Sequence, residues 1–344
     1  MLANAANDSA SVDALQPHDF LRRDARTHLS EDYCVAGAGC TLSTNSEEII
    51  AAARTSFRRV TKLATLDFSL RFWVEESAQS QSPWPNPYVR GLDHLVFAGF
   101  DCTSSILADL QTRQVIGRFS AAMAADAAHW RNVIFPIVVS ILGGSLGFVE
   151  LHASCIAKDG RGLLLIGPSR SGKSTLAMAL NAAGFTALSD DRAFCSRVDG
   201  RLQAWCPSRP VKLRPDAARW FDEYRGREPT AVQNGVRVFH CEPRGSRSQS
   251  IRECVPAMMV FLERQDTPCF SLKPILRGEA ALRIERELLA ESPEALQKQS
   301  RTLDQVLSLP CRILRYGGTP QAVAEKLAGL FLYGFECLSP DGAA

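Results

Sequence analysis

The octapeptide at residues 167–174, Gly-Pro-Ser-Arg-Ser-Gly-Lys-Ser, constrains this chain more than any other segment. It fits the pattern G-x-x-x-x-G-K-[ST], in which glycines let successive backbone N–H groups cradle phosphate oxygens. The apolar residues 163–166 predict a buried strand before it, and residues 173–183 predict a helix after it. A strand, a glycine-rich loop and a helix in this order predict an anion site at a helix N-terminus.

Each part of the loop has an expected task. Lys173 would reach the β and γ phosphates of a nucleotide, and the Ser174 hydroxyl would ligate Mg²⁺. The expected donor is therefore ATP with Mg²⁺, although base contacts cannot be read from the sequence and GTP or pyrophosphate stays open. The residues predicted to bind the nucleotide are Gly167, Pro168, Ser169, Arg170, Ser171, Gly172, Lys173, Ser174 and Thr175.

An acidic pair follows the predicted loop helix. Residues 186–189 predict a short strand that ends on Asp190 and Asp191, and adjacent side chains of an extended segment point to opposite faces. One carboxylate can then serve the metal while the other activates an acceptor hydroxyl. The apolar residues 260–262 followed by Glu263 are a second candidate for the metal carboxylate, interpreted here as a plain buried strand with a solvated acid.

His152 is the third candidate functional residue. It lies in the segment 148–157, which predicts a strand that precedes the loop strand. If the two strands pair as a hairpin, the imidazole comes close to the phosphates. A lone histidine in a strand is more often structural, so spacing alone does not decide its role.

These elements together resemble the HPr kinase/phosphorylase family, and more closely the HPr-kinase-related serine kinases often found in bacterial biosynthetic clusters. The matching strings are Leu-His-Ala-Ser at 151–154, the loop at 165–175, and Gly-Phe-Thr-Ala-Leu-Ser-Asp-Asp at 184–191. The residues 209–213, 259–264 and 309–316 fit more weakly. The resemblance covers about residues 130 to 335.

The resemblance implies a kinase core similar to that of phosphoenolpyruvate carboxykinase. It implies that Asp191 is the general base for a serine hydroxyl and that Lys173 and His152 stabilise the transferring phosphoryl group. Asp190 and Ser174 would serve the metal.

Three departures from the family limit what is carried over. The bifunctional enzymes have Glu-Ile-Arg-Gly after the core for the reverse reaction, whereas residues 209–215 here read Arg-Pro-Val-Lys-Leu-Arg-Pro. The sequence therefore does not predict phosphorolysis. Arg170 stands where relatives have glycine, which costs energy if that position needs a positive φ. The N-terminal half is unlike that of the bifunctional enzymes, so HPr itself is not the expected acceptor.

The order of predicted elements indicates an α/β protein, with α+β open, and length suggests about two domains. We expect a mobile tail at 1–30, a smaller mixed α+β domain of unknown role at 31–130, and the kinase domain at 131–344. Helices are predicted from residue 45, over 121–142 and over 320–333. Strands are predicted over 66–74, 94–100, 106–110, 114–119, 186–189 and 255–262.

Composition excludes some classes of protein. The net charge of +2 argues against a nucleic-acid or membrane coat. The apolar residues 132–149 are interrupted by Pro136 and several glycines, which predicts a buried helix followed by a glycine-rich turn. Eleven cysteines without a CxxC pattern indicate buried, reduced thiols, and a cytoplasmic location is expected. A homo-oligomer is left open.

The sequence thus predicts an ATP-dependent kinase that phosphorylates a serine hydroxyl of a protein, peptide or small molecule. Two alternatives stay open: a nucleotide-binding regulatory module without transfer, and a P-loop ATPase that drives an assembly. Basic residues after the core are either a phosphate clamp that orders on binding or a solvated loop; they are Arg209, Lys212, Arg214, Arg237, Arg244, Arg247 and Arg252.

Overall fold

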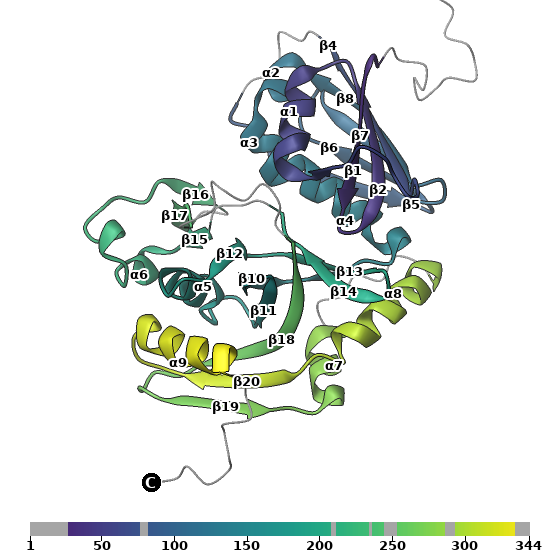
Figure 1. The fold of residues 1–344 in the computed structure, drawn as a ribbon. Helices are drawn as coiled ribbons and strands as arrows, with labels where there is room; N and C mark the ends of the chain where they lie inside the picture. Colours follow the sequence, from purple (N-terminus) through teal and green to yellow (C-terminus); the bar gives the residue numbers. More distant parts are fainter. Residues whose placement is uncertain are drawn as a thin grey trace, which may run out of the picture.

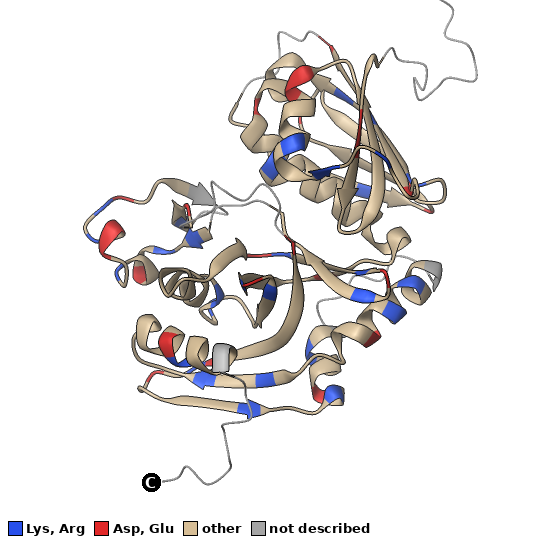
Figure 2. Ribbon diagram, viewed as in Figure 1, with Lys and Arg blue, Asp and Glu red and all other residues tan. Residues whose placement is uncertain are grey.

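The computed structural model describes residues 27–75, 82–207, 211–233, 236–243, 253–285 and 293–333. Most of the predicted tail lies outside these ranges, but its last two residues, Leu29 and Ser30, already belong to the first strand. The chain forms a mixed α/β structure in which a sheet from the N-terminal part stands above a second sheet from the C-terminal part (Figure 1). Figure 2 shows Lys and Arg interspersed with Asp and Glu over both parts.

The N-terminal sheet has eight strands in the order β3-β1-β2-β4-β8-β7-β6-β5. The strands predicted over 106–110 and 114–119 are confirmed as β7 and β8, which pair antiparallel around a tight turn. The strands are β1 (Leu29–Val35), β2 (Ala38–Thr44), β3 (Arg58–Arg59), β4 (Phe68–Glu75), β5 (Tyr88–Leu92), β6 (Leu95–Gly99), β7 (Ser105–Asp109) and β8 (Gln114–Ser120). In β4 the buried residues Phe68, Leu70 and Phe72 alternate with more exposed ones, as the sequence pattern predicts.

Helices pack on one face of this sheet. Helix α1 (Glu47–Ser56) begins where predicted, with the Ser46 hydroxyl accepting the backbone N–H of Ile49. The single helix predicted over 121–142 is wrong: the chain forms α2 (Ala121–Ala125), α3 (Ala127–His129), a π-helical turn (Trp130–Ile134) and α4 (Phe135–Leu146). The break occurs at Asp126, whose carboxylate accepts the His129 backbone N–H at 2.9 Å and starts a new helix.

Helix α4 is the buried helix expected from its composition. Gly143 and Gly144, which the sequence placed in a turn, remain inside the helix, and the left-handed Gly147 ends it. Its apolar side chains join a core with those of the N-terminal sheet, and Phe194 and Trp205 from the C-terminal part complete that core. Residue 130 lies inside the continuous helical segment 127–146, and the division into domains stays a prediction.

The C-terminal sheet carries the loop motif on its central strands. Strand β11 (Arg161–Ile166) pairs antiparallel with β10 (Ala153–Lys158) and parallel with β18 (Glu253–Arg264). The other members are β9 (Val149–Leu151), β12 (Thr186–Ser189), β13 (Ala193–Val198), β14 (Arg201–Trp205), β19 (Phe270–Pro274) and β20 (Cys311–Tyr316).

Helices cover both faces of this sheet, which explains its continuous apolar runs. Leu163 and Leu165 face a core shared with α5 (Lys173–Ala182) and α9 (Pro320–Tyr333). Leu164 and Ile166 face the opposite core, with α7 (Arg277–Glu285) and α8 (Pro293–Val306). Figure 1 shows α5 and α9 on one side of the sheet, and α7 and α8 on the other side.

The strand predicted over 148–157 is interrupted. It forms β9 and β10, which pair with different neighbours: β9 with β13, and β10 with β11 and β12. His152 lies at the break between them, so it is not inside a strand as expected. The break turns the chain from β9, at one edge of the sheet, to β10, between β11 and β12.

A small sheet beside α5 completes the C-terminal part. It has the order β15-β17-β16, with β15 (Val211–Leu213), β16 (Ala231–Gln233) and β17 (Val236–Cys241), next to α6 (Pro215–Ala218) and a 3₁₀ turn (Asp222–Tyr224). Within the described ranges every cysteine is a free thiol, and most are buried. No helix in those ranges is long and apolar enough to cross a membrane.

Candidate active site

The loop at residues 167–174 connects the end of β11 to the start of α5 and lines a cavity of about 520 Å³. Gly172 precedes α5 and no side chain caps that helix, so its first N–H groups are available to an anion. Lys173 is only 8% exposed, and its Nζ donates to the Gly167 carbonyl oxygen at 2.6 Å. The ammonium therefore sits over the loop, close to where phosphates would bind.

Tyr316 of β20 supports the loop from below. Its hydroxyl donates to the Ser171 carbonyl oxygen at 2.6 Å, and burial raises the pKa of the phenol to about 12. Gly172 adopts φ +93°, and a Cβ added there would lie 2.1 Å from the Tyr316 hydroxyl oxygen. Glycine is therefore required at residue 172 both for its left-handed backbone and for the closeness of the tyrosine.

Arg170 has a left-handed backbone with φ 71°. The sequence raised this position because relatives have glycine there, and the positive φ is what glycine accommodates without steric cost. The Arg170 side chain lines the loop cavity, where it adds a positive charge.

Asp190 lies buried at the base of the same cavity. Its Oδ2 accepts the Lys212 backbone N–H at 2.9 Å, while Oδ1 is buried and has no hydrogen-bond partner among the described residues. Burial raises the pKa of this carboxyl, against the opposing effects of the Ser174 hydroxyl and the Lys212 N–H. The backbone of Asp190 is fixed by a hydrogen bond that the Ser154 hydroxyl donates to the Asp190 carbonyl oxygen at 2.6 Å.

The donor set at Asp190 fits Mg²⁺. A buried carboxylate oxygen without a partner, beside a serine hydroxyl, is the kind of hard oxygen ligand that Mg²⁺ takes. The described residues contain no group of three or more His, Cys, Asp or Glu suited to a metal.

Asp191 turns to a different partner from Asp190. Its Oδ1 lies 3.1 Å from Nε2 of His152, and the two side chains are 38% and 41% exposed. Both residues line the loop cavity. The structure therefore brings together the candidates His152, Lys173, Ser174, Asp190 and Asp191, which the sequence had proposed from three separate segments.

Cations from the small sheet and from β18 face the same cavity. Lys212, Arg214 and Arg264 are among its lining residues. Arg237 instead pairs with Glu228 at the surface. The other basic candidates, Arg209, Arg244, Arg247 and Arg252, lie outside the described residues.

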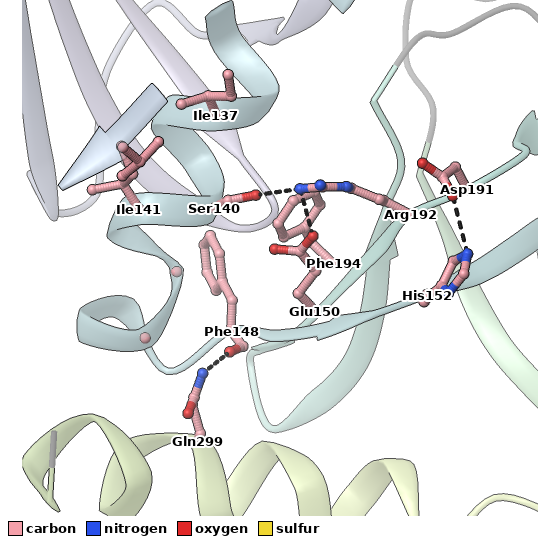
Figure 3. A pocket seen from close by; sticks show the side chains of 13 residues that line it. Ile137, Ser140, Ile141, Phe148, Glu150, His152, Asp191, Arg192, Phe194 and Gln299 are labelled. Atoms are coloured by element: carbon pink, nitrogen blue, oxygen red, sulfur yellow. Dashed lines mark hydrogen bonds and ion pairs between the residues drawn. The ribbon is translucent and has the colours of Figure 1, made fainter. Parts of the chain in front are cut away.

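A second cavity, of about 600 Å³, meets the first at His152 and Asp191. It lies between α4 of the N-terminal part and β9 and β13 of the C-terminal sheet (Figure 3). Arg192 crosses it, with its guanidinium donating to the Ser140 hydroxyl at 3.0 Å and pairing with Glu150 at 2.8 Å. The sequence gave no sign of this cavity, because its walls come from segments far apart along the chain.

Glu263, the other candidate for the metal carboxylate, has a different environment. It pairs with Arg283 at 3.1 Å and Arg315 at 2.8 Å, and these partners lower its pKa. It is not among the described residues that line the loop cavity. The strand end is as expected, but the acid is held in a double ion pair and is 28% exposed, so it is not the solvated acid that the sequence suggested.

Comparison with known proteins adds little to this geometry. No protein-family model and no curated protein sequence matches the chain. Among solved structures, the chain is similar to the Hpr(Ser) kinase/phosphatase from Coxiella burnetii, with 12% identity, a TM-score of 0.29, and coverage of 54% of this chain and 91% of that chain. A TM-score this low carries no inference about function, which therefore depends on the residues of the chain itself.

Proposed function

We propose that the protein is a kinase that transfers the γ-phosphoryl group of ATP to a serine hydroxyl of a protein, peptide or small molecule. The observation that carries this proposal is the convergence of the glycine-rich loop, Asp190 and the Asp191–His152 pair on one cavity. A regulatory nucleotide-binding module has no need of a carboxylate placed for proton removal beside the phosphate loop. By the sequence resemblance stated above, the core around this cavity would be of the phosphoenolpyruvate-carboxykinase type.

The residues divide the work of transfer among them. The loop backbone and the α5 N-terminus hold the phosphates, and Lys173 moves from its carbonyl partner to phosphate oxygens. Asp190 and Ser174 would hold Mg²⁺, which supplies charge neutralisation on the phosphates when bound. Asp191 accepts the proton of the acceptor hydroxyl, and His152 orients that carboxylate and offsets developing charge.

The bond changes balance in this scheme. The acceptor oxygen attacks the γ-phosphorus and a new O–P bond forms, while the bond from that phosphorus to the β–γ bridging oxygen breaks. ADP leaves with the bonding electron pair, and the hydroxyl proton passes to the Asp191 carboxylate. No co-reactant beyond ATP and the acceptor is required.

The test is transfer of label from γ-labelled ATP with Mg²⁺ to free serine, HPr and short serine-containing peptides. We expect label on at least one acceptor hydroxyl. Phosphate release in the absence of any acceptor, stimulated by a partner protein, would instead indicate the ATPase. Tight ATP binding without release or transfer would indicate the regulatory module.

A further inference from the structure

The cavity between the N-terminal part and the C-terminal sheet touches the reacting centre from the side opposite the phosphate loop. His152 and Asp191 are the residues that line both cavities. In phosphoryl transfer the attacking and leaving oxygens lie roughly in line on opposite sides of the phosphorus. With the nucleotide on the loop side, the acceptor hydroxyl must approach Asp191 from the other side, which is where the second cavity opens.

The walls of this cavity are mainly apolar. Ile137 and Ile141 come from α4, Phe148 follows that helix, and Phe194 belongs to β13. Figure 3 shows Ile137, Ile141 and Phe148 on one side of the pocket and the Asp191–His152 pair at the other. Apolar walls with a few convergent polar groups are the usual composition of a small-molecule site, and about 600 Å³ lies within the usual size range.

The basic side chains of the cavity, Arg192 and His152, each have an acidic partner. The Arg192 guanidinium is paired with Glu150 at 2.8 Å, and Asp191 is paired with His152 at 3.1 Å. An acceptor group with a negative charge would therefore find no uncompensated cation among these residues. It would also lose hydration against the aliphatic side chains of α4, which is costly for an ion.

We infer that this cavity is the acceptor site of the proposed kinase, and that it takes a hydroxyl on a compact, uncharged and largely apolar carrier, such as a serine flanked by aliphatic residues. The inference rests on the proposed function and specifies its substrate class. It also gives the N-terminal part a role, because α4 and Val89 of β5 supply walls of the cavity. Acceptor selection then depends on the half of the chain that lacks the loop motif.

The test compares two probes on the full chain with Mg²⁺ and a non-hydrolysable ATP analogue. The first probe is the neutral tripeptide acetyl-Leu-Ser-Leu-amide, and the second is the acidic acetyl-Glu-Ser-Glu-amide. Binding is followed by saturation-transfer NMR and calorimetry. We expect the neutral peptide to bind about tenfold or more tightly than the acidic one, because burying charge against apolar walls is unfavourable.

Variants locate the binding in the cavity. Ile137→Glu places a charge in the wall and is expected to weaken the neutral probe about tenfold or more, with nucleotide affinity unchanged. Ile137→Gln introduces a side chain with the shape of glutamate but without its charge, and it is expected to weaken binding of the neutral probe less. Val89→Glu places the same charge in an exposed strand. Because Val89 is 42% exposed, this substitution should leave folding intact. Leu92→Glu, which is 79% exposed and outside the lining, is the surface-charge control.

The outcomes separate this inference from the proposed function. Binding of the neutral peptide that is lost in both wall variants, without phosphorylation by ATP, would support the cavity and count against the kinase. Phosphorylation of an acceptor that neither wall variant affects would support the kinase and overturn the cavity as its acceptor site. Equal binding of the two peptides, or no binding of the neutral one, would also overturn the inference.

Discussion

The imidazole Nε2 of His152 lies 3.1 Å from Oδ1 of Asp191, at the border between the phosphate-loop cavity and the second cavity, which lies between α4 and the strands β9 and β13. His152 reaches this position because the chain breaks between β9 and β10, and Asp191 because β12 ends at Ser189. The contact holds the carboxylate beside the place where a γ-phosphoryl group would be transferred. It is the relationship on which the proposed proton transfer depends.

Asp191→Asn is expected to lower the rate of phosphoryl transfer by about 10²–10⁴-fold, the range that general-base catalysis contributes. ATP binding should stay close to the wild-type value, because in the proposed mechanism Asp190 holds the metal and Lys173 the phosphates. Calorimetric titration with ATP and single-turnover transfer measure the two effects separately. Asp159→Asn, in the turn between β10 and β11, is the matched control and should leave both unchanged.

Lys173→Met is expected to weaken ATP binding about tenfold or more, since a hydrogen bond to a charged group contributes about 1.5–3 kcal/mol. The variant also removes the bond from Nζ to the Gly167 carbonyl oxygen at 2.6 Å, so the empty loop should lose some order. Lys158→Met is the control, because it removes a similar hydrogen bond, to the Gly184 carbonyl oxygen at 3.0 Å, on the surface. Normal ATP affinity in Lys173→Met would contradict the assignment of this lysine to the phosphates.

Gly172→Ala is expected to destabilise the protein by more than Gly160→Ala, measured as the free energy of unfolding in urea. Both glycines have positive φ, which costs alanine about 1–2 kcal/mol. Only at residue 172 does the added Cβ meet a side chain, the Tyr316 hydroxyl at 2.1 Å, whereas nothing lies within 4 Å at residue 160. Tyr316→Phe should recover part of the difference in the double variant, and equal losses at the two glycines would show that the tyrosine does not constrain the loop.

The raised pKa of Asp190 predicts a pH dependence of stability. Because the folded protein holds this proton more tightly than the unfolded chain, the free energy of unfolding should fall as pH rises from the ordinary aspartate pKa through the raised one. Asp190→Asn should remove that contribution. Chemical unfolding of the nucleotide-free protein at a series of pH values checks both statements, and identical pH profiles would show that burial does not perturb this carboxyl.

Metal binding should follow the opposite trend over the same pH range. Only the ionised carboxylate is a good Mg²⁺ ligand, so affinity for Mg²⁺ with nucleotide should increase as pH rises through the raised pKa of Asp190. Calorimetric titration of Mg²⁺ into the protein with bound nucleotide measures this affinity. In Asp190→Asn the affinity should be low, and its pH dependence in this range should be reduced to that of the nucleotide phosphates. An unchanged profile would place the metal elsewhere.

Local sequence patterns predicted the limits of an element where its apolar periodicity and its end residues indicate the same boundary. Helix α9 has the predicted limits, Pro320–Tyr333, and β12 ends at Ser189 as expected, because apolar spacing and punctuating residues mark them. The break at His152 was missed because the apolar run through it contains no glycine or proline. Asp126 was missed as a helix start because it lies inside an alanine-rich segment that is helical on both sides.

Contacts between distant segments set the rest of the site. The sequence matched residues 309–316 weakly to the family it resembles but gave no reason for Tyr316 to contact the Ser171 carbonyl, because that contact requires β20 to lie beneath the loop. The second cavity likewise exists only after α4 packs above β9 and β13. Motif spacing therefore predicted which side chains gather around the glycine-rich loop, whereas the second cavity depends on tertiary packing.

Phosphoryl transfer through Asp191 is tested most directly by incubating the full chain with γ-labelled ATP, Mg²⁺ and acetyl-Leu-Ser-Leu-amide, and by dividing the product into labelled peptide and free phosphate. The proposed mechanism predicts label on the serine hydroxyl in the wild type, and its loss in Asp191→Asn with ATP binding retained. Label that appears only as free phosphate, or transfer that survives intact in Asp191→Asn, would contradict it.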